Sequence, residues 1–420
     1  MCSLVAPRQA GAAVRISLHE SQGHSTSGRL SGSPAPHDSG AGVCPNSPRF
    51  AMKIGRVQVD PPFALAPMAG MTDTAFRRLV KRHGGCGLVV TEMVSSEGLV
   101  RGIDRTLEYA EYTEEERPVS IQIFGGDPDT MAAAAQIVEG MGADIVDVNM
   151  GCPVRKIAKH NAGCSLMREP EHAAAVVRSM SKSVNVPVTV KMRAGWDENA
   201  INAPQLARMM EDAGAAAVAV HGRTAAQSYR GSSDWELIDE VAEGVRIPVF
   251  GSGDCVTADQ VVDRMTATRV SGVLVGRGAL RNPWIFQQAE TLTAGRAVSE
   301  AGASDRGAFL LDYIELLLTE DQETDGFRHV APLSLGHNGG RAGQPRPQKS
   351  RERWVVNKLR ALGSWYTKGL RGGSQLRAAI NHAESIGELR DIINGFFAEV
   401  ETSTTPRPDG EATSLARRIG

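Results

Sequence analysis

Eight short apolar runs recur along the middle of the chain, and stretches with the periodicity of an amphipathic helix separate them. The runs cover residues 64–70, 87–93, 118–125, 145–152, 187–193, 217–224, 247–254 and 272–280. They are nearly continuously hydrophobic, which is typical of parallel strands that are covered on both faces. Helical patterns lie between them, for example at 128–141, 169–180, 205–213 and 257–265. This alternation folds into a doubly wound sheet or a closed (β/α)8 barrel, and eight runs favour the α/β barrel.

The segments outside the runs predict the rest of the domain organisation. Residues 1–51 are rich in Ser, Gly, Pro and His without periodicity, so a disordered leader is expected before a barrel over 52–300. A small helical domain is expected over 301–400, with a Gly, Pro and basic linker near 331–350 and a disordered tail over 401–420. The helical patterns after the last run cover 283–290, 307–319, 353–366 and 374–397.

Composition restricts the class of protein. The six cysteines are scattered without close-paired spacing, so neither a disulfide framework nor a metal ligand set is indicated. No segment approaches the ~20 consecutive apolar residues of a membrane helix, and the N-terminus lacks the apolar core of a signal peptide. The sequence therefore predicts a cytoplasmic protein with no membrane partner and no metal.

Charge is distributed unevenly. The net charge is −2, yet residues 341–380 carry ten Lys or Arg against one acid, so this segment is +9 and the remainder is −11. A solvated tail is one interpretation of such a run. The aromatic residues Trp354, Trp365 and Tyr366 lie among the charges, and basic residues combined with aromatic ones are typical of nucleic-acid binding.

Polar or small residues close most of the apolar runs, and carboxyl ends of parallel barrel strands meet at one face. The residues expected at this face are Pro67, Met68, Ala69, Gln122, Asn149, Cys152, Lys191, Arg193, His221, Arg223, Ser252, Gly253, Asp254, Gly276, Arg277 and Gly278. The groups after the seventh and eighth runs are small and glycine-rich, as in loops that bind phosphate through backbone N–H groups. Arg277 could add a charge-assisted bond to that phosphate.

Individual residues leave alternatives open. Cys152, in a Gly-Cys-Pro turn, is either a reactive thiol or a small buried hydrophobe. Lys191 is a solvated strand-end lysine, a Schiff-base nucleophile or a fixed positive charge beside an anionic cofactor. Arg193 and His221 suit an electropositive pocket for a reduced, anionic flavin. Because no Gly-x-Gly-x-x-Gly opens a helix after a strand, a mononucleotide flavin is expected rather than a tightly held dinucleotide.

Taken together, the motifs resemble those of the tRNA-dihydrouridine synthases, and of the bacterial B-type branch in particular. The resemblance covers residues 52–280 and resumes at 354–397. The matching motifs are Ala66-Pro-Met-Ala-Gly-Met-Thr-Asp73, Gln122, Asn149-Met-Gly-Cys-Pro153, Ala162-Gly163, Leu166-Met167, Lys191-Met-Arg-Ala-Gly195, His221-Gly-Arg-Thr224, residues 251–254 and Gly276-Arg-Gly278. Two departures are Ser252, where the family has Asn, and a missing histidine before the Trp365-Tyr366 pair.

The resemblance implies a barrel that holds flavin mononucleotide (FMN) and is reduced by NADPH. The residues that would hold the isoalloxazine are Pro67, Met68, Ala69, Gln122, Lys191 and His221. Those that would hold the phosphate are Ser252, Gly253, Asp254, Gly276 and Arg277. Asn149 would hold the target uracil of tRNA, with Arg193 and Lys156 as further substrate contacts. Cys152 would be the proton donor.

The implied reaction reduces the uracil 5,6 double bond, with hydride from the flavin to C6 and a proton from Cys152 to C5. Cys152 can donate that proton only as a thiol, so its pKa must not be strongly lowered. The uracil must also leave the RNA stack, at a cost of a few kcal/mol. Basic contacts from Lys156 and the C-terminal helices would offset that cost.

Three other interpretations compete with this one. A flavin barrel acting on a free pyrimidine, of the dihydroorotate or dihydropyrimidine dehydrogenase type, shares the fold and cofactor but leaves the +9 segment without a purpose. The interpretation as a non-catalytic tRNA-binding protein does not explain the polar residues at the strand ends. A phosphosugar aldolase would use Lys191 as a Schiff base.

Overall fold

The computed structural model describes residues 52–154, 157, 161–319, 327–330 and 348–404. Several predicted segments lie outside these ranges. They are the expected leader over 1–51, residues 331–347 of the expected linker and residues 405–420 of the expected tail. The predicted substrate contact Lys156 also lies outside them.

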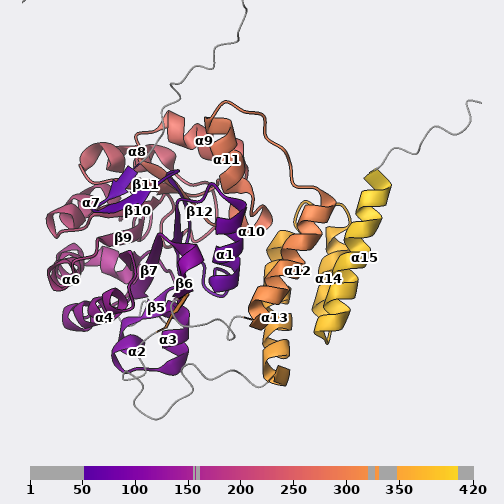
Figure 1. The fold of residues 1–420 in the computed structure, drawn as a ribbon. Coiled ribbons are helices and arrows are strands. Elements are labelled where there is room, and N and C mark those ends of the chain that lie inside the picture. Colours follow the sequence, from indigo (N-terminus) through magenta and orange to yellow (C-terminus); the bar gives the residue numbers. More distant parts are fainter. Residues whose placement is uncertain (1–51, 155–156, 158–160, 320–326, 331–347, 405–420) are drawn as a thin grey trace, which may run out of the picture. The chain divides into compact units, whose positions relative to one another are not determined.

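Eight parallel strands close into a barrel, which confirms the fold that the apolar runs predict (Figure 1). They are β3 (Phe63–Leu65), β4 (Leu88–Val90), β7 (Val119–Phe124), β8 (Ile145–Met150), β9 (Val188–Arg193), β10 (Ala217–His221), β11 (Val249–Ser252) and β12 (Gly272–Val275). Each pairs in parallel with the next, and β12 pairs with β3 to complete the ring. The short strand β5 (Val94–Ser95) adds to β7 at the rim.

Helices follow the strands and lie around the barrel (Figure 1). They are α1 (Thr74–His83), α2 (Ser96–Val100), α3 (Asp104–Ala110), α4 (Pro128–Gly140), α6 (Pro170–Ser183), α7 (Ala203–Asp212), α8 (Trp235–Gly244), α9 (Ala258–Ala267), α10 (Arg277–Arg281) and α11 (Ile285–Thr293). Local chemistry sets where several begin. Asp73, Asp127 and Asp234 cap α1, α4 and α8 by accepting a backbone N–H of the first turn. Thr257 and Gln260 form a capping box at the start of α9.

Among the strands that the structure describes, four short ones form two pairs outside the barrel. β1 (Met52–Ile54) and β2 (Val57–Val59) form an antiparallel hairpin, and Met52, Ile54 and Val59 are buried. β6 (Tyr112–Thr113) pairs with β13 (Arg328–His329). This second pair brings a segment far along the chain back to the barrel, where Arg328 forms an ion pair with Glu111.

In the described part of the chain, four helices follow the barrel and lie side by side (Figure 1). They are α12 (Ala303–Thr319), α13 (Gln348–Tyr366), α14 (Gly373–His382) and α15 (Ile386–Thr404). α12 packs on α1, and α13 packs on α10. Phe309 links these elements, because its ring stacks on Tyr366 at 5.4 Å and meets Phe76 edge-on at 6.0 Å. The helices therefore share one hydrophobic core with the barrel.

Two predicted elements are each divided into two in the structure. The strand predicted over 272–280 ends at Val275, and α10 begins directly after Gly276. The helix predicted over 374–397 is broken into α14 and α15, because Ser385 accepts the N–H of Glu388 and starts a new helix. α15 then continues to Thr404, into the expected tail. Among the described residues, no helix combines the length and apolarity needed to cross a membrane.

Candidate active site

A cavity of about 880 Å³ opens at the carboxyl ends of the barrel strands. Its lining includes all the predicted site residues that the structure describes, namely Pro67, Met68, Ala69, Gln122, Asn149, Cys152, Lys191, Arg193, His221, Ser252, Gly253, Asp254, Gly276 and Arg277. Strand register explains this convergence. Asn149 lies opposite Lys191, and His221 lies opposite both Arg193 and Ser252.

Cys152 lies in a tight turn directly after β8. The side-chain oxygen of Asn149 accepts the N–H groups of Gly151 (3.2 Å) and Cys152 (2.9 Å), and the Cys152 carbonyl accepts the N–H of Cys164 at 3.1 Å. Gly163 packs against this turn at φ +62°, where a Cβ would come within 2.8 Å of the Cys152 oxygen. The turn is thus held from both sides, and its thiol lines the cavity.

Burial raises the pKa of the Cys152 thiol, and nearby Arg193 and Lys191 offset only part of that effect. The side chain is half-buried, so Cys152 is neither a sealed core residue nor an activated thiolate. At neutral pH it is a protonated acid beside an open cavity.

Lys191 and His221 differ in charge although they share the cavity. Burial lowers the pKa of Lys191 to about 8, so its ammonium stays charged at neutral pH. Across the described residues, the side chain of Lys191 makes no hydrogen bond and no ion pair. Burial and the neighbouring cations lower the pKa of His221 to about 2, so its imidazole is neutral. His221 Nδ1 accepts the N–H of Arg223 at 3.2 Å, which leaves the ring proton on Nε2.

Arg193 is largely committed to the protein itself. Its Nε donates to the Gly151 carbonyl at 2.8 Å, and its Nη1 donates to the carbonyls of Thr224 and Ser228 at 3.0 Å. The guanidinium therefore ties the Cys152 turn to the loop after β10.

The glycine-rich end of the cavity is built around Asp254. Its carboxylate accepts Arg223 Nη2 and the Ser233 N–H, and Arg277 lies 3.7 Å away. These contacts lower the pKa of Asp254 against the opposing effect of burial. Because the carboxylate faces cations, an anion here would meet backbone N–H groups and Arg277 rather than the Asp254 side chain. Gly253 has φ +127°, and a Cβ would lie 2.3 Å from Ser233 Oγ.

Two aromatic residues line the cavity that were not predicted as its residues. Tyr229 is 60% exposed and lies between two guanidinium groups, 5.9 Å from that of Arg193 and 4.8 Å from that of Arg277. Trp365 reaches the cavity from α13. The sequence marks Trp365 only as an aromatic residue within the basic segment, and no local pattern marks Tyr229 in the loop after β10.

The basic segment is used differently from what its composition predicts. Arg351 is buried and donates to the Leu317 carbonyl, Lys358 forms ion pairs with Asp73 and Glu92, and Arg360 donates to the Ala383 carbonyl. Tyr366 is fully buried, and its hydroxyl donates to the Arg306 carbonyl. The prediction that the Tyr366 ring contacts nucleic acid is therefore wrong.

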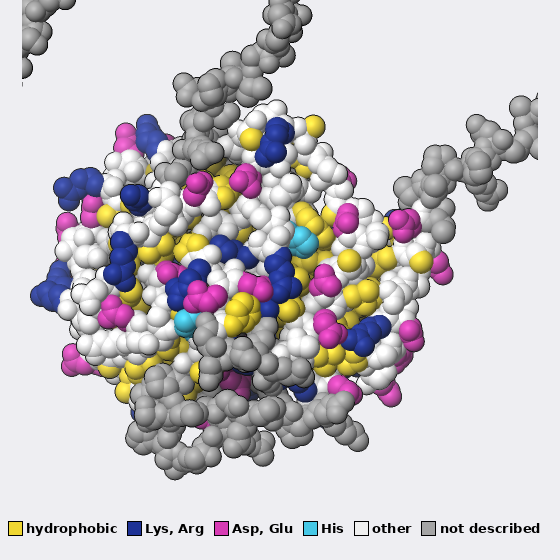
Figure 2. All heavy atoms as spheres, in the orientation of Figure 1, with side chains coloured by type: hydrophobic (Ala, Val, Ile, Leu, Met, Phe, Trp, Pro, Cys, Tyr) yellow, Lys and Arg dark blue, Asp and Glu magenta, His cyan; other side chains and the backbone are white. Residues whose placement is uncertain are grey.

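A smaller basic cluster remains near the cavity. The ammonium of Lys368 lies 3.8 Å from the Trp365 ring centre, and the guanidinium of Arg281 lies 6.0 Å from it. Partial burial, Arg281, Arg377 and Arg277 lower the pKa of Lys368. On the face drawn in Figure 2, by contrast, Lys and Arg side chains alternate with Asp and Glu.

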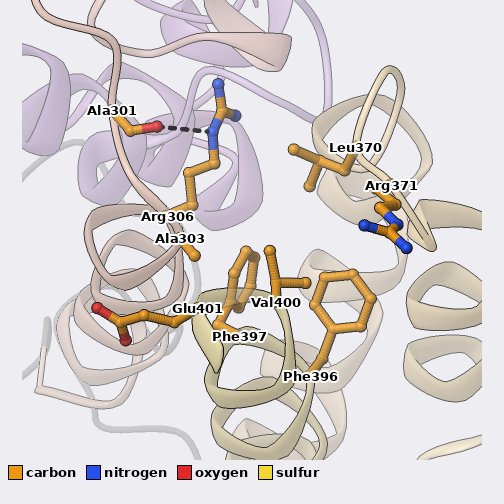
Figure 3. Close-up of a pocket in the computed structure, with 9 residues that line it drawn as sticks. All are labelled: Ala301, Ala303, Arg306, Leu370, Arg371, Phe396, Phe397, Val400 and Glu401. Carbon is orange, nitrogen blue, oxygen red and sulfur yellow. Dashed lines mark hydrogen bonds between the residues drawn. The ribbon is translucent and has the colours of Figure 1, made fainter. Parts of the chain in front are cut away.

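A second cavity of about 460 Å³ lies among the C-terminal helices (Figure 3). Leu370, Phe396, Phe397 and Val400 form its apolar wall, and Arg306 on its edge donates to the Ala301 carbonyl. None of the predicted site residues lines it.

A closed parallel barrel with a polar cavity at its carboxyl end defines an enzyme of the TIM-barrel class. Residues 64–338 match the family model described as dihydrouridine synthase (Dus). The chain belongs to this family, and is by membership an enzyme, a flavoprotein oxidoreductase that modifies tRNA.

Named relatives align over most of their length. A "Probable tRNA-dihydrouridine synthase" of Rickettsia conorii is 33% identical over 83% of this chain and 97% of the relative. "tRNA-dihydrouridine synthase B" of Xanthomonas axonopodis pv. citri is 37% identical over 83% and 98%. The protein of that name from Pseudomonas aeruginosa is 33% identical over 84% and 98%.

Proposed function

We propose that this enzyme reduces particular uridines of tRNA to 5,6-dihydrouridine with FMN as cofactor and NADPH as electron donor. The observation that carries the proposal is a protonated thiol, Cys152, beside the unpaired cation Lys191 in one barrel cavity. Relatives named as tRNA-dihydrouridine synthases, several of them of the B type, support the substrate class.

The residues present fit FMN. The cavity has the volume of a typical cofactor site. Lys191 lines it without a protein partner and would stabilise an anionic isoalloxazine, while Pro67, Met68, Ala69, Gln122 and neutral His221 would complete the ring's surroundings. The phosphate would lie at the glycine-rich end, beside Ser252, Gly253, Asp254, Gly276 and Arg277.

The bound flavin would supply hydride to C6 of the uracil. Cys152 would then deliver its proton to C5, which requires the thiol form that burial favours. Asn149 would hold the uracil beside the thiol. Arg193 would act mainly by fixing the Gly151 carbonyl and thereby the turn that carries Cys152.

The exposed ring of Tyr229, at the cavity, offers a surface on which an unstacked base can lie. The cluster of Arg281, Lys368 and Trp365 would hold the neighbouring RNA backbone. Because Trp365 also lines the cavity, this surface is continuous with the site of chemistry. That continuity favours tRNA over a free pyrimidine as the substrate.

The test is mass spectrometry of unmodified tRNA after incubation with the protein, FMN and NADPH. New dihydrouridine at one position is expected, and Cys152→Ala should lose it while keeping bound flavin. Cys86→Ser is the matched control, because Cys86 is buried away from the cavity and its thiol donates to the Leu88 carbonyl, as a serine can. A yellow, NADPH-reducible protein that leaves folded tRNA unmodified would support the free-pyrimidine alternative, and a colourless one the binding protein.

A further inference from the structure

A buried carboxylate that is not among the predicted site residues lies beneath the active site. Asp147 is on β8, two residues before Asn149, so both side chains point into the barrel. It is 5% exposed. One carboxylate oxygen accepts Gln122 Nε2 at 2.7 Å, and the other accepts Thr189 Oγ1 at 2.6 Å.

The hydrogen bonds continue from Asp147 to the turn that carries the thiol. Gln122 Oε1 accepts Asn149 Nδ2 at 2.7 Å, and Asn149 Oδ1 accepts the N–H groups of Gly151 and Cys152. Gln122 and Asn149 are both buried. Two side-chain amides in series thus connect a carboxylate to the backbone of Cys152.

The carboxylate sets the direction of this series. A side-chain amide can be turned end for end, whereas a carboxylate only accepts hydrogen bonds. A reversed Gln122 would place its oxygen against the oxygen of Asp147. Gln122 must therefore present its oxygen to Asn149, and Asn149 must present its own oxygen to the Cys152 turn.

We propose that Asp147 is a positioning residue that fixes the orientation of the Gln122 and Asn149 amides, and through them the place of the Cys152 thiol. The inference rests on the proposed function for its effect on catalysis. A displacement of about 1 Å can cost on the order of a hundredfold in rate, so proton delivery depends on this placement.

Two substitutions of Asp147 distinguish the effect of its hydrogen-bond acceptors from the effect of its negative charge. Asp147→Leu removes every acceptor. Asp147→Asn keeps one oxygen for Gln122 and can place its NH2 group against Thr189, whose hydroxyl can also accept. Thr189→Val is the matched control, because it removes the carboxylate's other partner and leaves the series to Cys152 intact.

Two measurements are made on each protein. The first is the rate of Cys152 alkylation by iodoacetamide against pH without flavin, followed by mass spectrometry of the Cys152 peptide so that other cysteines do not contribute. The second is kcat and KM for dihydrouridine formation in tRNA.

Asp147→Leu should free the turn and expose the thiol, shifting its alkylation profile toward lower pH. It should also lower kcat by about ten- to a hundredfold, with KM for tRNA within about twofold. Asp147→Asn and Thr189→Val should keep the wild-type alkylation profile. An unchanged profile in Asp147→Leu would overturn the proposal, and so would equal losses in the Leu and Asn variants, which would assign the effect to charge.

If Asp147→Leu does not fold, Gln122→Met interrupts the same series at its next member and should shift the profile in the same direction. An unshifted profile there would refute the inference. Because alkylation needs neither flavin nor tRNA, it tests the inference even if the wild-type protein forms no dihydrouridine and the proposed function fails.

Discussion

Lys358→Met should destabilise the protein strongly, because Lys358 is the cation between two buried carboxylates. Its ammonium lies 2.9 Å from Asp73 and 3.6 Å from Glu92, and its side chain is 13% exposed. Removing one partner of a buried ion pair costs about 3–5 kcal/mol when the remaining charge is uncompensated. In the variant, the Asp73 carboxylate still accepts hydrogen bonds from the Phe76 N–H and the Tyr313 hydroxyl. We therefore expect a loss of roughly 3 kcal/mol, the lower end of that range.

The loss should depend on pH in a defined direction. Burial already raises the pKa of Glu92, and removing Lys358, which opposes that effect, raises it further. A carboxyl group whose pKa is higher in the folded state than in the unfolded state costs stability as pH rises between the two values. The deficit of Lys358→Met relative to wild type should therefore be smaller at pH 5 than at pH 8.

Urea denaturation followed by circular dichroism at both pH values measures this. Adding Glu92→Gln to Lys358→Met should recover part of the loss at pH 8. Arg371→Met, at an exposed position of the same basic segment, should stay within about 0.5 kcal/mol of wild type. If Lys358→Met behaves like Arg371→Met at both pH values, the ion pairs are solvated and the reasoning is refuted.

Three further predictions concern the cavity. Gly163→Ala should lower kcat without loss of bound flavin, because its Cβ would press on the Cys152 carbonyl; equal kcat in steady-state assays would contradict this. Tyr229→Ala should raise KM for tRNA and Tyr229→Phe should not, since the ring face is the proposed contact; similar KM values in both variants would exclude stacking. Flavin affinity, measured by fluorescence titration, should weaken as pH rises through about 8, where Lys191 loses its charge. Lys191→Met should abolish that dependence, and a flat wild-type profile would exclude a cationic Lys191 beside the ring.

The barrel and most of its cavity could be predicted from the amino-acid sequence. Continuous apolar runs that alternate with amphipathic helices favour parallel strands covered on both faces, and a count of eight favours a closed ring. Once the strands are parallel, their carboxyl ends must meet, so residues as distant as Gln122 and Arg277 converge without any knowledge of tertiary contacts. The Gly-Cys-Pro turn was readable for the same reason, because it directly follows such a strand.

Which charged groups and aromatic rings face solvent could not be predicted in this way, because it depends on tertiary contacts. Lys358 looked like an RNA contact, but it pairs with Asp73, 285 positions earlier in the chain. Tyr366 looked like a stacking ring, but Phe309 covers it. Asp147 is a polar residue within an apolar run of the sequence, and its proposed role depends on Gln122 and Thr189 on neighbouring strands. The burial of a side chain and the identity of its hydrogen-bond or ion-pair partner depend on contacts between distant segments. A local sequence pattern therefore does not predict them.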